Sequence, residues 1–248
     1  MEFIKDFFNE LFSMFKPYYK YIRFFLVFIL FFLSSLFQLI PISLFNIDIN
    51  NASTLTRSLL LLFSEGITLI IIIVLYYKDI KKDILKFKKY KKDKLSIIYD
   101  HSFRYWLVGL IIMFVSNFII SKLGIGSASN DVKVINNLAA SPLIFGSMTL
   151  IIKPIIEELI FRLSFKNVIK NKWLFIIISG VIFGAIHVVF SVNDIYQLLY
   201  LIPYCSLGIA FSYMYYESDN ILVPISFHIL HNTITAITTF LLAGAFVW

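Results

Sequence analysis

The chain has 248 residues, of which 59% are hydrophobic and 18% aromatic, whereas only 15% carry a charge. A soluble domain usually has about a quarter charged residues, so this composition excludes a disordered chain and argues strongly against a soluble globular enzyme. The single cysteine, Cys205, cannot form an internal disulfide. Together with a mean hydropathy of +0.84, these numbers predict an all-α polytopic membrane protein.

Long apolar runs predict about seven transmembrane helices, because a helix that crosses the ~30 Å hydrocarbon core needs about 20 apolar residues. The N-terminal segment before the first run mixes charged and aromatic residues, which is typical of an amphipathic helix at the membrane interface. The predicted spans are Phe24–Ile47, Ser58–Tyr77, Tyr105–Ser121, Val134–Ile169, Trp173–Asn193, Ile195–Tyr216 and Asn220–Trp248.

Lysine-rich segments predict how these spans are oriented. Nine lysines and three aspartates lie in Lys78–Lys94, and three more lysines lie in Lys166–Lys172. Both segments are predicted to be cytoplasmic loops, which places the N-terminus in the cytoplasm and the C-terminus outside. The basic loop is expected to contact anionic membrane lipids, and we expect no nucleic-acid partner. The economical division is residues 1–100, with the amphipathic segment, two spans and the basic loop, and a core at residues 101–248.

The fourth predicted span concentrates ionisable residues, which cost several kcal/mol within a bilayer and are therefore candidates for function. Glu158 and Arg162 are four residues apart, so they can form an ion pair on one helix face. Glu157 points about 100° away and is left for chemistry. Lys153 lies four residues before Glu157, but Pro154 is expected to disturb that pairing. A cluster that only fixes helix packing is the alternative interpretation.

Three further spans contain polar residues of interest. Phe183 and His187 share a helix face in the fifth span, and His228 and Asn232 share one in the seventh. At about 1.5 Å per residue, Glu157, His187 and His228 lie at similar depths, so one shared site is geometrically allowed. Glu65, alone in the second span, is expected to have a packing or hydrogen-bonding role.

The three motifs together resemble those of the CPBP intramembrane proteases, the CAAX protease and bacteriocin-processing family, also called Abi or Rce-type. The resemblance covers roughly residues 137–240. It is carried by Glu157-Glu158-Leu159-Ile160-Phe161-Arg162, Phe183-Gly184-Ala185-Ile186-His187 and His228-Ile229-Leu230-His231-Asn232. It implies a multi-pass protein of the cell membrane, here a bacterial plasma membrane, that cleaves a hydrophobic peptide or a membrane protein.

By this resemblance, Glu157 and His187 activate a water molecule, and His228 and Asn232 stabilise the oxyanion. Glu158, Arg162 and Phe183 support them. No cofactor is expected, because no His-Glu-x-x-His pair is present to hold a metal on one helix. If the activity depends on zinc, the ligands would be Glu157, Glu158, His187 and His228.

The expected substrates are a peptide pheromone, a bacteriocin or its precursor. A second hypothesis is a noncatalytic bacteriocin-immunity or scaffold protein of the same fold. A third hypothesis is a proton-coupled transporter. The sequence argues against it, because it shows neither the internal symmetry nor the paired broken spans that are common in transporters.

Overall fold

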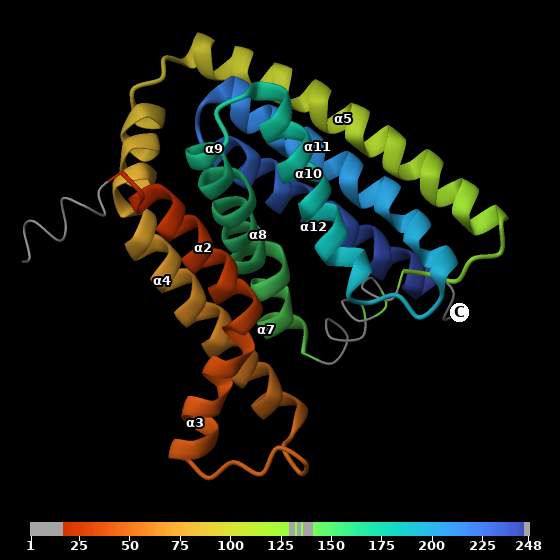
Figure 1. Cartoon of the computed structure of the whole chain (residues 1–248). Helices are drawn as coiled ribbons and strands as arrows, with labels where there is room; N and C mark the ends of the chain where they lie inside the picture. Colours follow the sequence, from red (N-terminus) through yellow and green to blue (C-terminus); the bar gives the residue numbers. More distant parts are fainter. Residues whose placement is uncertain (1–16, 129–131, 133–134, 136–140, 246–248) are drawn as a thin grey trace, which may run out of the picture.

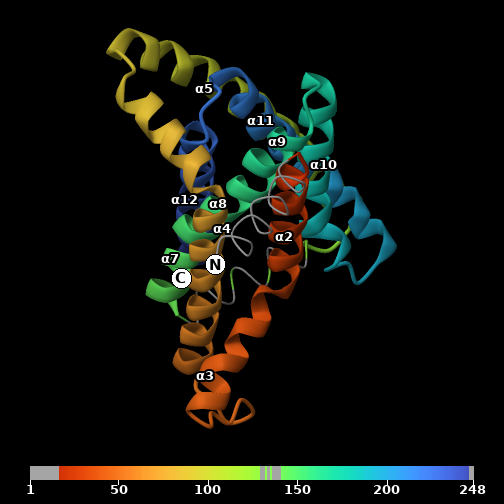
Figure 2. The same ribbon diagram turned by 60° about the vertical axis from the view of Figure 1, so that its left-hand side comes forward.

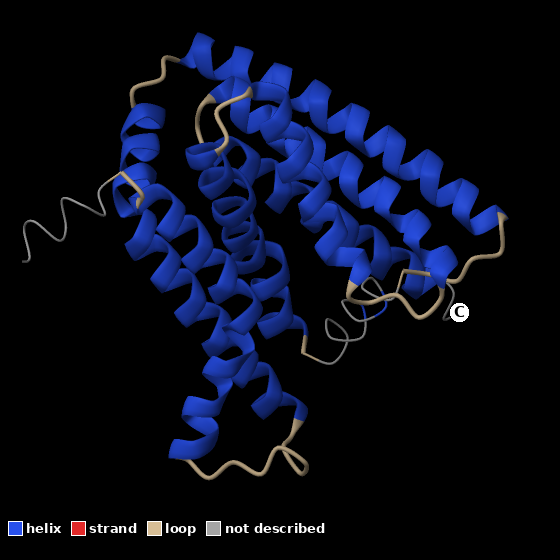
Figure 3. Ribbon diagram, in the orientation of Figure 1, coloured by secondary structure: helices blue, strands red, loops and turns tan. Residues whose placement is uncertain are grey.

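The computed structural model describes residues 17–128, 132, 135 and 141–245, with side chains described as far as residue 238. Within these residues the chain consists of helices joined by loops and contains no strand (Figure 3). The all-α fold predicted from composition is therefore confirmed. The predicted amphipathic segment at the N-terminus lies almost wholly outside the described residues.

The first predicted span is interrupted. Helix α2 (Tyr19–Leu33) passes into a 3-10 turn, η1 (Ser34–Gln38), and then into the short helix α3 (Leu39–Leu44). The Ser34 hydroxyl donates to the Phe31 carbonyl, and such local bonds compete with the backbone ladder of an α-helix. In Figure 1, α3 and the loop that follows it project away from the other helices.

The basic stretch predicted as a loop, Lys78–Lys94, is largely helical, so that prediction was wrong. Helix α4 (Thr54–Lys88) bends at Tyr76 and continues to Lys88, and α5 (Lys92–Lys122) begins after a short turn. Lysine is a good helix former, so the loss of apolar character marks the end of a membrane span and not the end of its helix.

A column of short helical segments occupies the centre of the molecule (Figure 1). It lies between α2 and α4 on one side and α10, α11 and α12 on the other (Figures 1 and 2). The predicted span Val134–Ile169 is described from Pro142 onwards. Its segments are α7 (Pro142–Ser147), η2 (Met148–Ile152), α8 (Lys153–Glu158), η3 (Leu159–Ser164) and α9 (Phe165–Val168). The two η segments of this column are π-helical turns, so the regular turn α8 is flanked by wider turns on both sides.

The remaining helices form the other half of the bundle. They are α10 (Lys172–Val189), η4 (Ile195–Tyr200, a 3-10 turn), α11 (Leu201–Ser218) and α12 (Leu222–Ala245). Helix α5 packs along α11 on its outer side (Figure 1).

Helices α10 and α11 approach each other closely because glycine lines both surfaces. A Cβ atom added to Gly184 would lie 2.6 Å from the backbone nitrogen of Cys205, and one added to Gly180 would lie 2.6 Å from that of Ile209. Gly208 on α11 in turn faces the carbonyl oxygen of Gly180. The Gly-x-x-x-Gly face therefore sets the position of α10, and with it that of His187, against α11.

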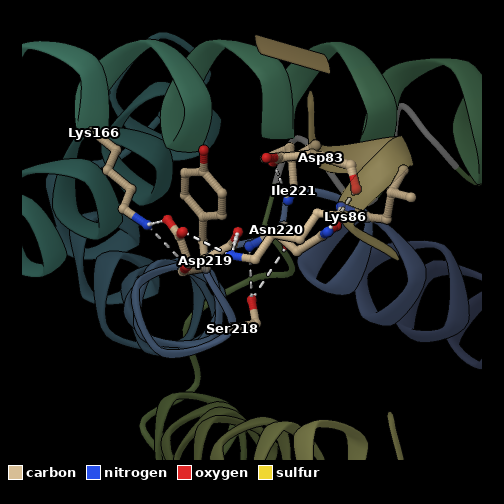
Figure 4. A network of polar contacts seen from close by, with 9 residues as sticks. Asp83, Lys86, Lys166, Ser218, Asp219, Asn220 and Ile221 are labelled. Carbon is tan, nitrogen blue, oxygen red and sulfur yellow. Dashed lines mark hydrogen bonds and ion pairs between the residues drawn. The ribbon is translucent and has the colours of Figure 1, made fainter. Parts of the chain in front are cut away.

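A polar network ties the turn between α11 and α12 to the basic end of α4 (Figure 4). Asp219, in the left-handed conformation with φ of 47°, accepts from Lys86 Nζ and Lys166 Nζ, both at 2.7 Å. Partial burial would raise the Asp219 pKa, but hydrogen bonds from these two lysines lower it to about 2. The ionised Asp219 carboxylate therefore stabilises the fold fully above the ordinary pKa of aspartate. This stabilisation is lost as the pH falls towards 2.

Asp83 on α4 completes this network (Figure 4). Its carboxylate accepts from the Ile221 backbone N–H at 2.8 Å, and its carbonyl accepts from Asn220 Nδ2 at 2.8 Å. The N-terminus of α12 is therefore fixed relative to α4, which in turn positions His228 two turns further along α12.

Five helices in the described part of the chain are long and apolar enough to cross a membrane: Tyr19–Leu44, Thr54–Lys88, Lys92–Lys122, Lys172–Val189 and Ile195–Ser218. The protein is therefore a multi-pass membrane protein. The count of seven spans and the orientation of the termini stay predictions. The division at residue 100, which falls within α5, also stays a prediction.

Substitution of Gly184 tests the close packing of α10 on α11. We expect Gly184→Ala to destabilise the protein by about 1–3 kcal/mol, because the new methyl group meets backbone atoms that cannot move independently. Thermal unfolding in detergent measures the effect. Gly66→Ala is the matched control, because nothing lies within 4 Å of a Cβ at Gly66 in the middle of α4. Equal melting temperatures for the two variants would contradict the packing argument.

Candidate active site

A buried ion pair lies at the centre of the site. Glu158, at the end of α8, and Arg162, in η3, both have no exposed surface. Arg162 Nε lies 3.1 Å from Glu158 Oε2, so the ion pair predicted from their spacing is confirmed. A buried charge without a partner costs several kcal/mol, so each group requires the other.

His228 on α12 lies between the two adjacent carboxylates. Its Nδ1 is 2.9 Å from Glu158 Oε1, and its Nε2 is 3.6 Å from Glu157 Oε2. The ring of Phe211 stacks on His228 with the centroids 4.9 Å apart. Because Arg162 binds the other oxygen of Glu158, the ion pair also sets the orientation of the His228 ring.

His187 on α10 faces Glu157 from the other side. Its Nδ1 donates to the Phe183 carbonyl at 2.8 Å, because a carbonyl can only accept. When the ring is neutral, Nε2 therefore carries the lone pair, and this atom lies 3.7 Å from Glu157 Oε1. Tyr204 on α11 stacks on the ring at 5.3 Å. His187 is thus held in one tautomer, with a proton acceptor directed at the glutamate.

Phe183 joins the charged and the histidine parts of the site. Its ring centroid lies 4.5 Å from the guanidinium carbon of Arg162 and 4.6 Å from the ring of His187. The ring also meets His228 edge-on at 5.7 Å. The negative face of the ring stabilises the guanidinium, and the ring excludes water from the ion pair.

Asn232 lies one turn beyond His228 on α12. Its Nδ2 donates to the Thr149 carbonyl in the π-turn η2 at 3.0 Å. His231 points in another direction, towards Trp106 of α5, with ring centroids 6.5 Å apart. The structure therefore brings Glu157, His187 and His228 together, whereas the recorded contact of Asn232 is with the Thr149 carbonyl.

Glu158, one of the four residues named as zinc ligands, has no oxygen left for a metal. Both oxygens of Glu158 already face partners, namely His228 and Arg162. In the described part of the chain, no group of three or more His, Cys, Asp or Glu side chains is arranged to hold a metal ion. We therefore derive no step through a metal.

Several neighbours of the site carry no signal in the sequence. Tyr204 and Phe211 stack on the two histidines from α11, and the Thr149 carbonyl is presented by a π-turn. Such contacts cross between helices, and helical spacing predicts only contacts within one helix. The packing or hydrogen-bonding role expected for Glu65 stays a prediction, and its carboxylate also interacts electrostatically with Lys153 and Glu157.

Comparison with known proteins places the site within a family region. Residues 139–234 match the model of the family "Type II CAAX prenyl endopeptidase Rce1-like". "Putative membrane peptidase YdiL" of Bacillus subtilis is 26% identical over 69% of this chain and 68% of its own length. "UPF0177 protein YxdF" of Lactococcus lactis is 29% identical over 47% of this chain and 66% of its own length.

An uncharacterized protein of Mycoplasma capricolum is 26% identical over 69% of this chain, which covers 52% of that protein. No solved structure matches the chain. The matched region contains all three motifs, so the chain carries an Rce1-like region and its resemblance to the CPBP intramembrane protease family is confirmed.

Proposed function

We propose that the protein is an intramembrane endopeptidase that hydrolyses peptide bonds with a water molecule activated by Glu157 and His187. The family match and the name of the Bacillus subtilis relative support a membrane protease of the CAAX type. The observation that carries the mechanism is the convergence of His187 Nε2 and His228 Nε2 on the two oxygens of Glu157, at 3.7 and 3.6 Å.

These distances are too long for direct hydrogen bonds, which favours a water molecule shared between the groups. Glu157 together with His187 takes one proton from this water molecule. The water oxygen then attacks the carbonyl carbon of the scissile peptide bond. The tetrahedral intermediate collapses as the C–N bond breaks, and the same proton passes to the leaving amine.

His228 is the proposed donor to the developing oxyanion. His228 Nδ1 forms a hydrogen bond with Glu158 Oε1. His228 Nε2 carries a hydrogen in two cases: when the ring is cationic, or when the proton of this hydrogen bond is on Glu158 and the neutral ring has its hydrogen on Nε2. Asn232 has a second amide hydrogen besides the one bonded to Thr149, and we assign this hydrogen to the same oxyanion. Fixed donors in an apolar site stabilise such charge strongly.

The substrate that fits this location is an apolar peptide or membrane protein, because His187 lies on α10, a helix long and apolar enough to cross a bilayer. We propose a peptide pheromone, a bacteriocin or its precursor, and a bacterial plasma membrane as the location. Membrane lipids surround the exposed apolar side chains of α2 and α5.

Replacement of Glu157 tests the proposal. We expect Glu157→Gln and His187→Ala to lower the cleavage rate by about 10²–10⁴-fold, because each removes the general base and leaves the shape of the site almost intact. The measurement compares peptides from membranes and medium of cells that produce equal amounts of each variant. A product with a new terminus in an apolar segment, present only with the wild type, identifies the substrate.

Two variants control for the loss of a carboxylate or an imidazole elsewhere. Glu217→Gln removes an exposed partner of Lys172, and His101→Ala removes an exposed ring on α5. Both should cleave at the wild-type rate. If Glu157→Gln retains the wild-type peptide profile, the proteolytic proposal fails, and a noncatalytic immunity or scaffold role takes its place.

Replacement of Arg162 tests the supporting ion pair. We expect Arg162→Ala to lower the free energy of unfolding by about 3–5 kcal/mol, because Glu158 then remains buried without a counter-charge. Arg104→Ala is the matched control, since Arg104 pairs with Asp100 at the same spacing but both side chains are largely exposed. That pair should contribute at most about 1 kcal/mol. Thermal unfolding measures both variants. Similar losses of unfolding free energy would refute the claim that the buried ion pair contributes more than the exposed one.

Chelation tests the expectation that no metal takes part. Cleavage by purified protein should continue unchanged after dialysis against EDTA and after addition of 1,10-phenanthroline, because the proposed steps use only side chains and water. Loss of cleavage that zinc restores would overturn this part of the mechanism.

A further inference from the structure

Lys153 is an exposed cation without a close counter-ion. It begins α8, one turn before Glu157, and its side chain is exposed. None of the hydrogen bonds and ion pairs recorded in the described part of the chain involves its ammonium group. By contrast Lys86, Lys166 and Lys172 each bind a carboxylate at 2.7 Å or less.

The depth of Lys153 makes this exposure costly unless the ammonium lies in a polar space. Lys153 is roughly 16 Å along the helix from Pro142 and roughly 22 Å from Val168, at about 1.5 Å per residue. A lysine side chain reaches the membrane interface only from near a helix end. A charged side chain in the middle of a span normally faces a bundle interior or a water-filled cavity.

Lys153 lies on the same face of α8 as Glu157, one turn before it. Its ammonium interacts electrostatically with Glu157, with His187 on α10 and with Glu65 on α4. The packing agrees, because Leu62, three residues before Glu65, lies in the same apolar cluster as Ile152. Lys153 thus acts on two carboxylates, those of Glu65 and Glu157, neither of which lies within 4 Å of its ammonium group.

We propose that Lys153 binds a carboxylate of the peptide substrate and so selects which bond lies against Glu157. This inference rests on the proposed function and names the feature of the substrate that the site recognises. The carboxylate can be the C-terminus of the peptide or an acidic side chain close to the scissile bond.

The two cations near Glu157 differ in whether they can take a further anion. Arg162 is engaged with Glu158, so it cannot neutralise a further negative group. Lys153 and Arg162 both act electrostatically on Glu157, but Arg162 is fully buried and Lys153 is exposed. A substrate carboxylate approaching Glu157 would be repelled unless it meets Lys153 first. Glu65 competes for the same ammonium in the free protein.

Binding of short apolar peptides tests the proposal without relying on cleavage. The probes are dansyl-Leu-Phe-Ile with a free C-terminal acid, the same peptide as its C-terminal amide, and dansyl-Leu-Asp-Ile-amide. Fluorescence anisotropy with the purified full chain in detergent micelles gives each affinity, and mass spectrometry verifies that the probes stay intact. At least one carboxylate-bearing probe should bind the wild type about 10-fold more tightly than the neutral amide.

Variants then assign this preference to Lys153. Lys153→Met should abolish it, Lys153→Arg should retain it, and Glu65→Gln should increase it by removing the competing carboxylate. Lys170→Met, which removes an exposed lysine at the cytoplasmic end of the column, should leave it unchanged.

The pattern of binding separates the sources of the carboxylate. Preference for the free-acid peptide identifies the C-terminus, and preference for the aspartate peptide identifies a side chain. Equal binding of all three probes to the wild type, or an unchanged preference in Lys153→Met, would overturn the inference. A preference that persists in a protein without peptidase activity would refute the proposed function alone.

Discussion

The buried ion pair between Glu158 and Arg162 is the constraint on which the rest of the site depends. Both groups have no exposed surface in a bundle of apolar helices, so any arrangement that separated them would leave a charge uncompensated. The pair occupies one oxygen of Glu158 and leaves the other for His228 Nδ1. Phe183 covers the guanidinium and contacts both histidines. Residues of α8, α10 and α12 are thus positioned by one salt bridge.

Two consecutive carboxylates acquire different environments because of their positions on one helical turn. Glu158 turns inward and is fully buried between an arginine and a histidine, whereas Glu157 points about 100° away towards two imidazole nitrogens. The wider π-turns η2 and η3 lie on either side of α8. π-turns are frequent at functional sites, and here one of them presents the Thr149 carbonyl to Asn232.

Predictions from sequence succeeded where the interaction is local in the chain. The Glu158–Arg162 pair follows from a spacing of four residues on one helix. The stacking of Tyr204 and Phe211 on the histidines depends on how α11 is rotated, which no single-helix pattern specifies. The prediction of a loop at Lys78–Lys94 was wrong because its lysines indicate where the membrane span ends, whereas the helix α4 continues to Lys88.

The interpretation of Glu65 and Lys153 changes once the helices are assembled. In the sequence Glu65 is an isolated charge in an apolar span, and Pro154 argues against pairing of Lys153 with Glu157. In the structure the two charges lie on neighbouring elements beside the same carboxylate, yet none of the three forms a close ion pair with another. The inner pair, Glu158 and Arg162, is neutralised and sealed, so it serves to hold His228. The outer charges, Glu65, Lys153 and Glu157, form no close ion pair with one another. They therefore remain available to a polar group of the substrate.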